Sequence, residues 1–381
     1  MIGRRRGAWA VLCALLTVSL SGCWDIATPE PLTIPVLLAV DWVHGRYQVT
    51  VESDVPQLMH SPGASSGSGA ERPTWVFQGT GSSVTEALRR TGLDFPNRNP
   101  LTFAHLRVVV ISPAVLRSPG WPGLVDRLMR APYLHRTFWV LVSRSQAMPF
   151  AETTNPVGPD PVEVLNQTLK AAEHDGWAYP VRMYQIAEHW LNQPAEAAVL
   201  PVLALRPEPG VASGSDFSVV GAAVVTPLGL AGEWSRRETE TYGLLAGRAP
   251  SLLLSLKDGG RRYVLQTVSS HFHIALAAGR LTVAGQVAVT LDEVDGTGPL
   301  LSASAIQRRA AEVLAHDALA LVRWSQAHRL DLFACYPKAL ATRPFSAAPN
   351  PKTWTAALAR APVTVTVAVT LRDTGSLNPQ A

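Results

Sequence analysis

The first 23 residues constrain the chain most, because they have the pattern of a signal for export across a membrane. The segment from Met1 to Arg6 is short and basic, and the segment from Gly7 to Ser19 is apolar. A basic start, a short apolar core and small residues before a cleavage point are typical of a secretory leader. The apolar segment is shorter than the roughly 20 residues that a membrane-spanning helix needs. We therefore expect residues 1–22 to be removed and the rest of the chain to fold outside the cytoplasm.

The leader ends in Leu20-Ser21-Gly22-Cys23, which is the pattern of a bacterial lipobox. This pattern implies that the Cys23 thiol receives a diacylglyceryl group and that the chain is cut just before it. Two acyl chains give stable anchoring, because each buried methylene contributes about 0.8 kcal/mol. The plainer alternative is a secretory peptide that happens to contain a cysteine. We favour lipidation at Cys23, with the chain on the outer face of the cytoplasmic membrane.

Cysteine use agrees with this interpretation. Cys13 leaves with the leader and Cys23 is used for the lipid, so Cys335 is the only cysteine left in the mature chain. A single cysteine cannot form an internal disulfide. Cys335 could be a nucleophile, but a lone cysteine is more often a small buried hydrophobic residue, and we prefer that interpretation.

The net charge of the chain does not indicate a nucleic-acid partner. The formal charge is +4 at pH 7, but without Arg4, Arg5 and Arg6 the chain has 30 basic residues against 29 acidic ones. A protein that neutralises many phosphates needs a clustered basic face. The mature chain has no basic run longer than a doublet, so we expect no binding to nucleic acid.

Residue patterns in the first half of the chain predict a mixture of strands and helices. Residues 36–43 form an apolar run, and Gly45 separates it from 46–55, where Tyr47, Val49 and Val51 alternate with polar residues. Such alternation predicts a half-buried strand. The same reasoning predicts strands at 74–78, 106–111, 137–143 and 198–205, and helices at 83–90, 121–130, 161–174 and 181–192.

The second half of the chain has the pattern of strands, a long helix and a final strand. A hairpin is expected at 217–234, and Ser235 and Glu238 form a capping box that begins a helix. Ser304 begins a helix of about 25 residues, and the last strand is the alternating segment 363–371. Further strands are expected at 262–268, 271–277 and 281–291.

The fold class that follows is α+β, in a multi-domain chain with mixed or antiparallel sheets and packed helices. The long helix and the terminal strand belong to the C-terminal region. The expected divisions are a signal peptide at 1–22, an N-terminal domain at 23–205, a linker at 206–216 and a C-terminal domain at 217–376. A further division of the C-terminal domain is expected near 258–261.

One motif matches that of a serine hydrolase in letters only. Gly63 to Gly67 spells G-x-S-x-G. A nucleophile elbow requires a strand before the motif and a helix after it. This motif lies instead in a Ser- and Gly-rich stretch at 61–73, which we expect to be a mobile loop. We therefore expect no hydrolase site.

Two other groups of residues suggest metal binding or acid–base chemistry. His271 and His273 would share one face of a strand, an arrangement that can bind metal, but no third ligand is apparent. Asp292, Glu293 and Asp295 could include an acid–base pair, but they have the pattern of an acidic turn. We expect no catalytic residue, no metal and no cofactor.

Several stretches, taken in order, resemble one known family. Gly22-Cys23-Trp24-Asp25 is similar to the mature start of the C-subunit lipoproteins of bacterial spore germinant receptors, the Ger(x)C family. The stretches that agree after it are Val40-Asp41, 47–52, 79–87, 101–112, 126–130, 221–224, Glu238-Thr239, 331–333 and Trp354. The resemblance extends over nearly the whole chain.

This resemblance implies a non-enzymatic subunit of a nutrient-sensing complex in the inner spore membrane, required for germination. Its partners would be two integral membrane subunits, of the A and B types, and lipid at Cys23 would hold it beside them. It also implies three domains. The alternative is a solute-binding lipoprotein of an ABC importer, which would have two α/β lobes joined by a hinge. We expect this chain to end in antiparallel strands and a long helix, which favours the receptor subunit.

Overall fold

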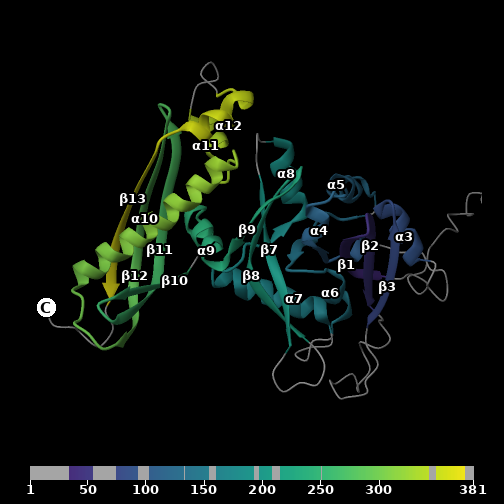
Figure 1. Ribbon diagram of the computed structural model, residues 1–381, viewed down its shortest axis with the longest axis horizontal. Helices are drawn as coiled ribbons and strands as arrows, with labels where there is room; N and C mark the ends of the chain where they lie inside the picture. Colours follow the sequence, from purple (N-terminus) through teal and green to yellow (C-terminus); the bar gives the residue numbers. More distant parts are fainter. Residues whose placement is uncertain are drawn as a thin grey trace, which may run out of the picture.

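The computed structural model describes residues 34–54, 74–92, 103–132, 134–153, 160–192, 197–207, 215–249, 251–342 and 349–373. Their strands form one nine-stranded sheet and one four-stranded sheet, which lie side by side in Figure 1. Cys23, the G-x-S-x-G motif and the Ser- and Gly-rich stretch lie outside the described residues. The α+β fold class, with a long helix and a terminal strand in the C-terminal region, is confirmed.

The large sheet has the strand order β3-β2-β1-β4-β5-β7-β8-β9, and the short β6 pairs with β5. Strands β1, β4, β5 and β7 run parallel to one another, and the remaining pairs are antiparallel. The bounds are β1 Ile34–Val43, β2 Arg46–Asp54, β3 Thr74–Gly81, β4 Val108–Ile111, β5 Trp139–Ser143, β6 Val181–Arg182, β7 Ala198–Pro207, β8 Ser215–Thr226 and β9 Gly229–Ser235.

Helices cover both faces of the large sheet. On one face pack α3 (Val84–Thr91), α4 (Pro113–Leu116), α5 (Trp121–Arg130) and α8 (Met183–Asn192), and on the other pack α6 (Met148–Glu152) and α7 (Pro161–His174). The prediction that β2 is half-buried is therefore wrong. Thr50 is 1% exposed and Glu52 is 0% exposed, because α6 covers the face on which they lie.

Local pairing shifts two predicted boundaries in this sheet. β4 begins at Val108 rather than at residue 106, after the short 3-10 helix η1 (Phe103–His105). α8 begins at Met183 rather than at residue 181, because Val181 and Arg182 pair with β5. The helix at 121–130 has the predicted bounds.

The small sheet has the order β10-β11-β12-β13, and helices lie on one of its faces (Figure 1). Ile274, Val283 and Leu314 are among the buried residues of its core. The strands are β10 Leu253–Asp258, β11 Arg261–Ala277, β12 Arg280–Gly296 and β13 Val363–Asp373, and the helices are α9 Arg236–Leu245, α10 Ala303–Ala327, α11 Cys335–Thr342 and α12 Pro351–Arg360.

Three expectations for this region need correction. The predicted strands at 262–268 and 271–277 are one strand, β11, which continues through two register shifts. Asp292, Glu293 and Asp295 lie within β12 rather than in a turn, because the strand extends to Gly296 in pairing with β11. The final strand β13 pairs parallel to β12, not antiparallel. A parallel pair needs a long connection, which α10, α11 and α12 supply here.

The two sheets share an apolar core. Val199 and Val224 of the large sheet belong to the same buried cluster as Val283 of the small one. Pro207 pairs with Ser215, so residues 206–216 contain the paired ends of β7 and β8. Residues 258–261 likewise contain the paired ends of β10 and β11. Neither sheet divides at these places, and the limits of the folding domains stay a prediction.

Candidate functional site at the start of the first strand

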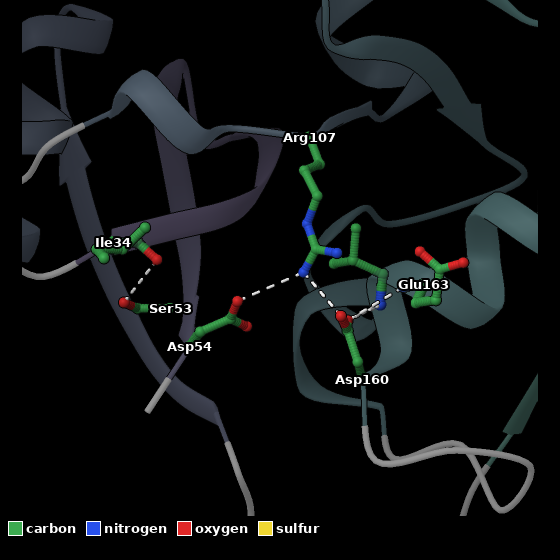
Figure 2. Close-up of polar contacts among 7 residues, drawn as sticks. Ile34, Ser53, Asp54, Arg107, Asp160 and Glu163 are labelled. Atoms are coloured by element: carbon green, nitrogen blue, oxygen red, sulfur yellow. Dashed lines mark hydrogen bonds and ion pairs between the residues drawn. The ribbon is translucent and has the colours of Figure 1, made fainter. Parts of the chain in front are cut away.

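An arginine shared by two carboxylates lies where the described chain begins. Figure 2 shows the Arg107 guanidinium between the side chains of Asp54 and Asp160. Its Nη2 atom is 2.9 Å from an oxygen of Asp160 and 3.4 Å from an oxygen of Asp54. Beside them, the Ser53 hydroxyl donates a hydrogen bond to the carbonyl of Ile34 at 3.0 Å. This group ties the start of β1 to β2, β4 and α7, and we call it the strand-entry cluster (Ile34, Ser53, Asp54, Arg107 and Asp160).

Each charged member of the cluster stands at the end of an element. Asp54 is the last residue of β2, and Arg107 directly precedes β4. The Arg107 amide donates to the carbonyl of Val36 at 2.9 Å, which places the arginine beside β1. Asp160 is the N-cap of α7, and its carboxylate accepts from the amides of Val162 and Glu163. A carboxylate at this position also interacts favourably with the helix dipole.

Burial perturbs one of these carboxylates. Burial, as the largest cause, raises the pKa of Asp54 from 3.8 to about 6; Arg107 opposes that rise and the Asp160 carboxylate adds to it. One oxygen of Asp54 is buried and has no hydrogen-bond partner among the described residues. The Asp54 side chain is only 18% exposed, so solvent screens these effects incompletely. The cluster is therefore sensitive to pH near 6.

A pocket of about 200 Å³ adjoins the cluster. Arg182 stacks on the ring of Trp139, 3.9 Å from its centroid, and the Trp139 ring nitrogen lies 3.3 Å from the amide oxygen of Asn166. The lining residues are Leu106, Arg107, Val108, Thr137, Trp139, Val162, Glu163, Asn166 and Arg182. Thr137 is the only hydroxyl-bearing residue among them, and its backbone carbonyl accepts from Arg182. The lining includes no serine, cysteine or histidine that could serve as a nucleophile or a general base.

The strand-entry cluster was not predicted from the sequence. Arg107 and Asp54 are 53 residues apart, and so are Arg107 and Asp160. The only local signal is Asp160-Pro161, since Asp before Pro is typical of a helix start. That signal predicts the cap but not its ion pair with Arg107.

The structure describes two more of the groups that the sequence suggested, the pair His271 and His273 and the residue Cys335. His271 and His273 are exposed on β11, and in the described residues no three His, Cys, Asp or Glu side chains are placed to hold a metal. Cys335 is 2% exposed. Burial, followed by the Asp331 charge, raises the pKa of its thiol, so the reactive thiolate is disfavoured.

Two buried aspartates act as clamps between distant elements. Asp41 of β1 accepts from the amides of Ala147 and Met148 at 2.9 and 2.8 Å, which fixes the start of α6. Asp331 accepts from the amides of Cys335 and Tyr336 at the start of α11. It also accepts from the indole of Trp354 in α12 at 3.0 Å. Asp41, Asp331 and Trp354 belong to the stretches that carry the family resemblance, and each has a structural role.

A close contact accounts for another of these stretches. A Cβ atom added to Gly79 of β3 would press against the backbone of Ala87 and Thr91 in α3. Ser83 caps this helix, and Glu86 accepts from the amide of Ser82. The strand and the helix therefore pack backbone to backbone, which only glycine permits.

No helix in the described ranges is both long enough and apolar enough to cross a bilayer.

Comparison with known proteins finds spore germination proteins. Residues 27–205 match the family model described as Spore germination protein N-terminal domain. The chain is 27% identical to spore germination protein KC of Bacillus subtilis, over 44% of this chain and 42% of that protein. It is 22% identical to spore germination protein A3 of the same organism, over 70% of this chain and 68% of that protein. The crystal structure of the GerBC protein matches with a TM-score of 0.54 and 14% identity, over 88% of this chain and 96% of that one, which shows a shared fold.

Proposed function

Because the chain belongs to the Ger(x)C family of spore germination proteins, we propose that it is the lipid-anchored C subunit of a nutrient germinant receptor. In this role it is not an enzyme. It acts by contacts with the integral membrane A- and B-type subunits at the outer face of the cytoplasmic membrane, which is the inner membrane of the spore. The match of residues 27–205 to the germination family carries the proposal.

The residues that carry the family resemblance stabilise the fold, which supports a subunit that acts by presenting surfaces to its partners. Asp41, Asp331 and Trp354 hold elements of the fold together through buried hydrogen bonds. The strand-entry cluster joins β1, β2, β4 and α7 through ion pairs and hydrogen bonds. A fold held together by buried hydrogen bonds presents surfaces of fixed shape to its partners. Such preorganisation lowers the entropic cost of binding.

Strand β1 begins at Ile34, close in sequence to Cys23, which supports a short link between the proposed lipid and the fold. Between the proposed lipid at Cys23 and the start of β1 at Ile34 lie residues that span at most about 40 Å when fully extended. A body held this close to the bilayer meets membrane partners at a high effective concentration.

Deletion of the gene tests the proposed function. Spores that lack the chain should fail to germinate on the nutrient of this receptor and should still germinate on a trigger that bypasses nutrient receptors. Each nutrient should be tested separately in a strain without redundant receptors. A normal response to every nutrient in that strain would contradict the proposal.

The lipid anchor is tested by Cys23→Ala, with Cys13→Ala in the leader as the matched control. We expect mass spectrometry of the native protein to show a diacylglyceryl group on residue 23 and no residue before it. The Cys23→Ala chain, if exported in normal amounts, should give slow germination, whereas the Cys13→Ala chain should behave as the wild type. An unmodified residue 23 in the native protein would refute the anchor.

A further inference from the structure

A pocket of about 160 Å³ is lined by residues of α3, α5, η1 and β1. Part of its lining belongs to the buried core, namely Leu38 of β1 and Leu128 of α5, which are 2% and 3% exposed. Leu88 of α3 and Phe103 of η1 also line it and are only partly buried. Figure 1 shows both helices on the part of the large sheet that is away from the small sheet. The pocket therefore leads from the surface to the core of the large sheet.

The lining of this pocket favours an apolar ligand of limited size. Among the described residues, every lining residue except Arg127 is apolar. Protein interiors contain few voids larger than a water molecule, and an apolar cavity of about 150 Å³ can hold a benzene-sized group. The pocket therefore has room for an apolar group of about six carbons. An acyl chain of a bilayer lipid spans about 15 Å, half of the apolar core of the membrane, and is too long for it.

The acidic side chains near the pocket are paired within their own helices. Glu86 and Asp126 are the acidic residues that lie within two positions of a lining residue along the sequence. Glu86 pairs with Arg90 of α3 at 2.6 Å, and Asp126 pairs with Arg130 of α5 at 2.5 Å. No acidic residue lines the pocket in the described part of the chain. A positively charged ligand would therefore meet no unpaired carboxylate there.

Three arginines near the pocket lack an acidic partner. Arg89, Arg127 and Arg136 form no ion pair with any described residue, although Arg136 donates to the carbonyl of Met129. The neighbouring Arg107 is paired within the strand-entry cluster. Arg127 lines the pocket and is half-buried. Taking a charge out of water without an opposite charge is costly, so an anion beside Arg127 would stabilise it, and a guanidinium can hold a carboxylate through two parallel hydrogen bonds.

We propose that this pocket binds a short-chain carboxylate, with an apolar chain of about six carbons inside the cavity and the carboxylate on Arg127. Burial of the chain against the apolar walls supplies affinity. The unpaired arginines select the anionic head and disfavour an ammonium group on a chain of the same length. Such a site goes beyond the proposed function, which requires no ligand in this chain, so the gene deletion and the binding test below can fail separately.

The test is photo-labelling of the full chain in its native membrane. The probe is hexanoic acid with a diazirine on its chain, and mass spectrometry identifies the residues to which it attaches. The expected result is attachment to the pocket walls, at Leu88, Phe103 or Leu128, which unlabelled hexanoate suppresses. The matched amine, hexylamine with the same diazirine, should attach to these walls at least about tenfold less.

Other patterns of labelling would overturn the proposal. Equal attachment by the acid and the amine would show an apolar void that does not recognise the anion. Attachment at scattered surface residues, or none, would show that the pocket does not bind short-chain carboxylates. Suppression by hexadecanoate but not by hexanoate would replace the proposed ligand by a long lipid chain.

Two variants and a matched control locate the site. Arg127→Gln should reduce the attachment of a subsaturating acid probe by about tenfold or more. Arg130→Gln is the control, because Arg130 is on the same helix, pairs with Asp126 and is not part of the pocket lining. This control should leave the attachment unchanged. Ala131→Leu fills part of the cavity with a larger apolar side chain and should abolish the attachment.

Thermal unfolding gives an independent measurement and shows whether each variant is folded. Hexanoate should raise the thermal midpoint of the wild type and of Arg130→Gln, because a ligand that binds only the folded state stabilises it. At the same concentration it should not raise the midpoint of Arg127→Gln or of Ala131→Leu. A full response of Arg127→Gln would refute the role of the arginine, even if Ala131→Leu failed to fold.

Discussion

Substitution of Asp54 by asparagine should stabilise the protein at neutral pH, although it removes one member of an ion pair. Burial raises the pKa of Asp54 from 3.8 to about 6. The folded state therefore binds the proton more tightly than the unfolded state does. Since the folded state holds more protons between pH 4 and 6, the free energy of unfolding falls as the pH rises through this window.

The size of the effect follows from the same pKa values. Each pKa unit corresponds to about 1.4 kcal/mol, so ionised Asp54 costs the fold about 3 kcal/mol above pH 6. Because the Asp54 side chain is 18% exposed, most of this cost should survive solvent screening. Asparagine carries no charge, and Arg107 keeps the closer Asp160 as its partner. Asp54→Asn should match the wild type near pH 4 and exceed its stability by up to about 3 kcal/mol at pH 7.

The assay is urea unfolding of the mature chain at pH 4, 5, 6 and 7, with Asp160→Asn as the control. Asparagine at position 160 still caps α7, but the substitution removes the Asp160 carboxylate. Arg107 thereby loses its closer ion-pair partner, and Asp54 loses a neighbouring negative charge. Asp160→Asn should lower the free energy of unfolding at pH 7 by about 1 kcal/mol or less. It should also move the pH range over which the stability changes to lower values, because the Asp160 charge helps to raise the pKa of Asp54. If Asp54→Asn proves less stable than the wild type at pH 7 and keeps the same dependence on pH, the reasoning is refuted.

Four further predictions concern the clamps and close contacts. Asp331→Ala leaves three buried donors unpaired and should lower the free energy of unfolding, measured by thermal unfolding, by at least about 3 kcal/mol. A loss below about 1 kcal/mol would contradict the role of Asp331 as a clamp. Gly79→Ala should cost more than about 2 kcal/mol of stability because its Cβ would meet backbone atoms. Gly92→Ala should be nearly neutral, because among the described residues its Cβ would come no closer than 3.5 Å to a neighbour, the Arg89 carbonyl oxygen. Ser235→Ala breaks a complete capping box and should cost about 1 kcal/mol, as measured by urea unfolding. Cys335 should resist maleimide at pH 8 in the folded protein and react after denaturation; fast labelling of the folded chain would show that its thiol is not held in the buried, raised-pKa state.

The sequence predicts those elements whose cause is local. The capping box of Ser235 and Glu238 does begin α9, and the helix expected to begin at Ser304 is α10, which is capped by Ser302. The alternation at 363–371 is the strand β13. In each case the residues that cause the structure lie within a few positions of it, so a single stretch contains the whole signal.

The parts that sequence patterns miss depend on distant partners. The polar face of β2 is buried because α6, about a hundred residues later, covers it. The direction of β13 relative to β12 is set by the path of the chain through α10 to α12, which alternation does not encode. The strand-entry cluster forms only when Arg107, just before β4, contacts both Asp54 and Asp160, which lie far from it on either side along the sequence. Charge pairs of this kind have no fixed spacing along the chain.

The distribution of these features bears on where function resides. Asp41, Asp331 and Gly79, which help to make the chain recognisable as a germination protein, are used inside the fold. The GerBC protein shares this fold at 14% sequence identity. Substitution of Asp41, Asp331 or Gly79 should therefore lower the stability of the fold before it changes any surface that a partner could contact.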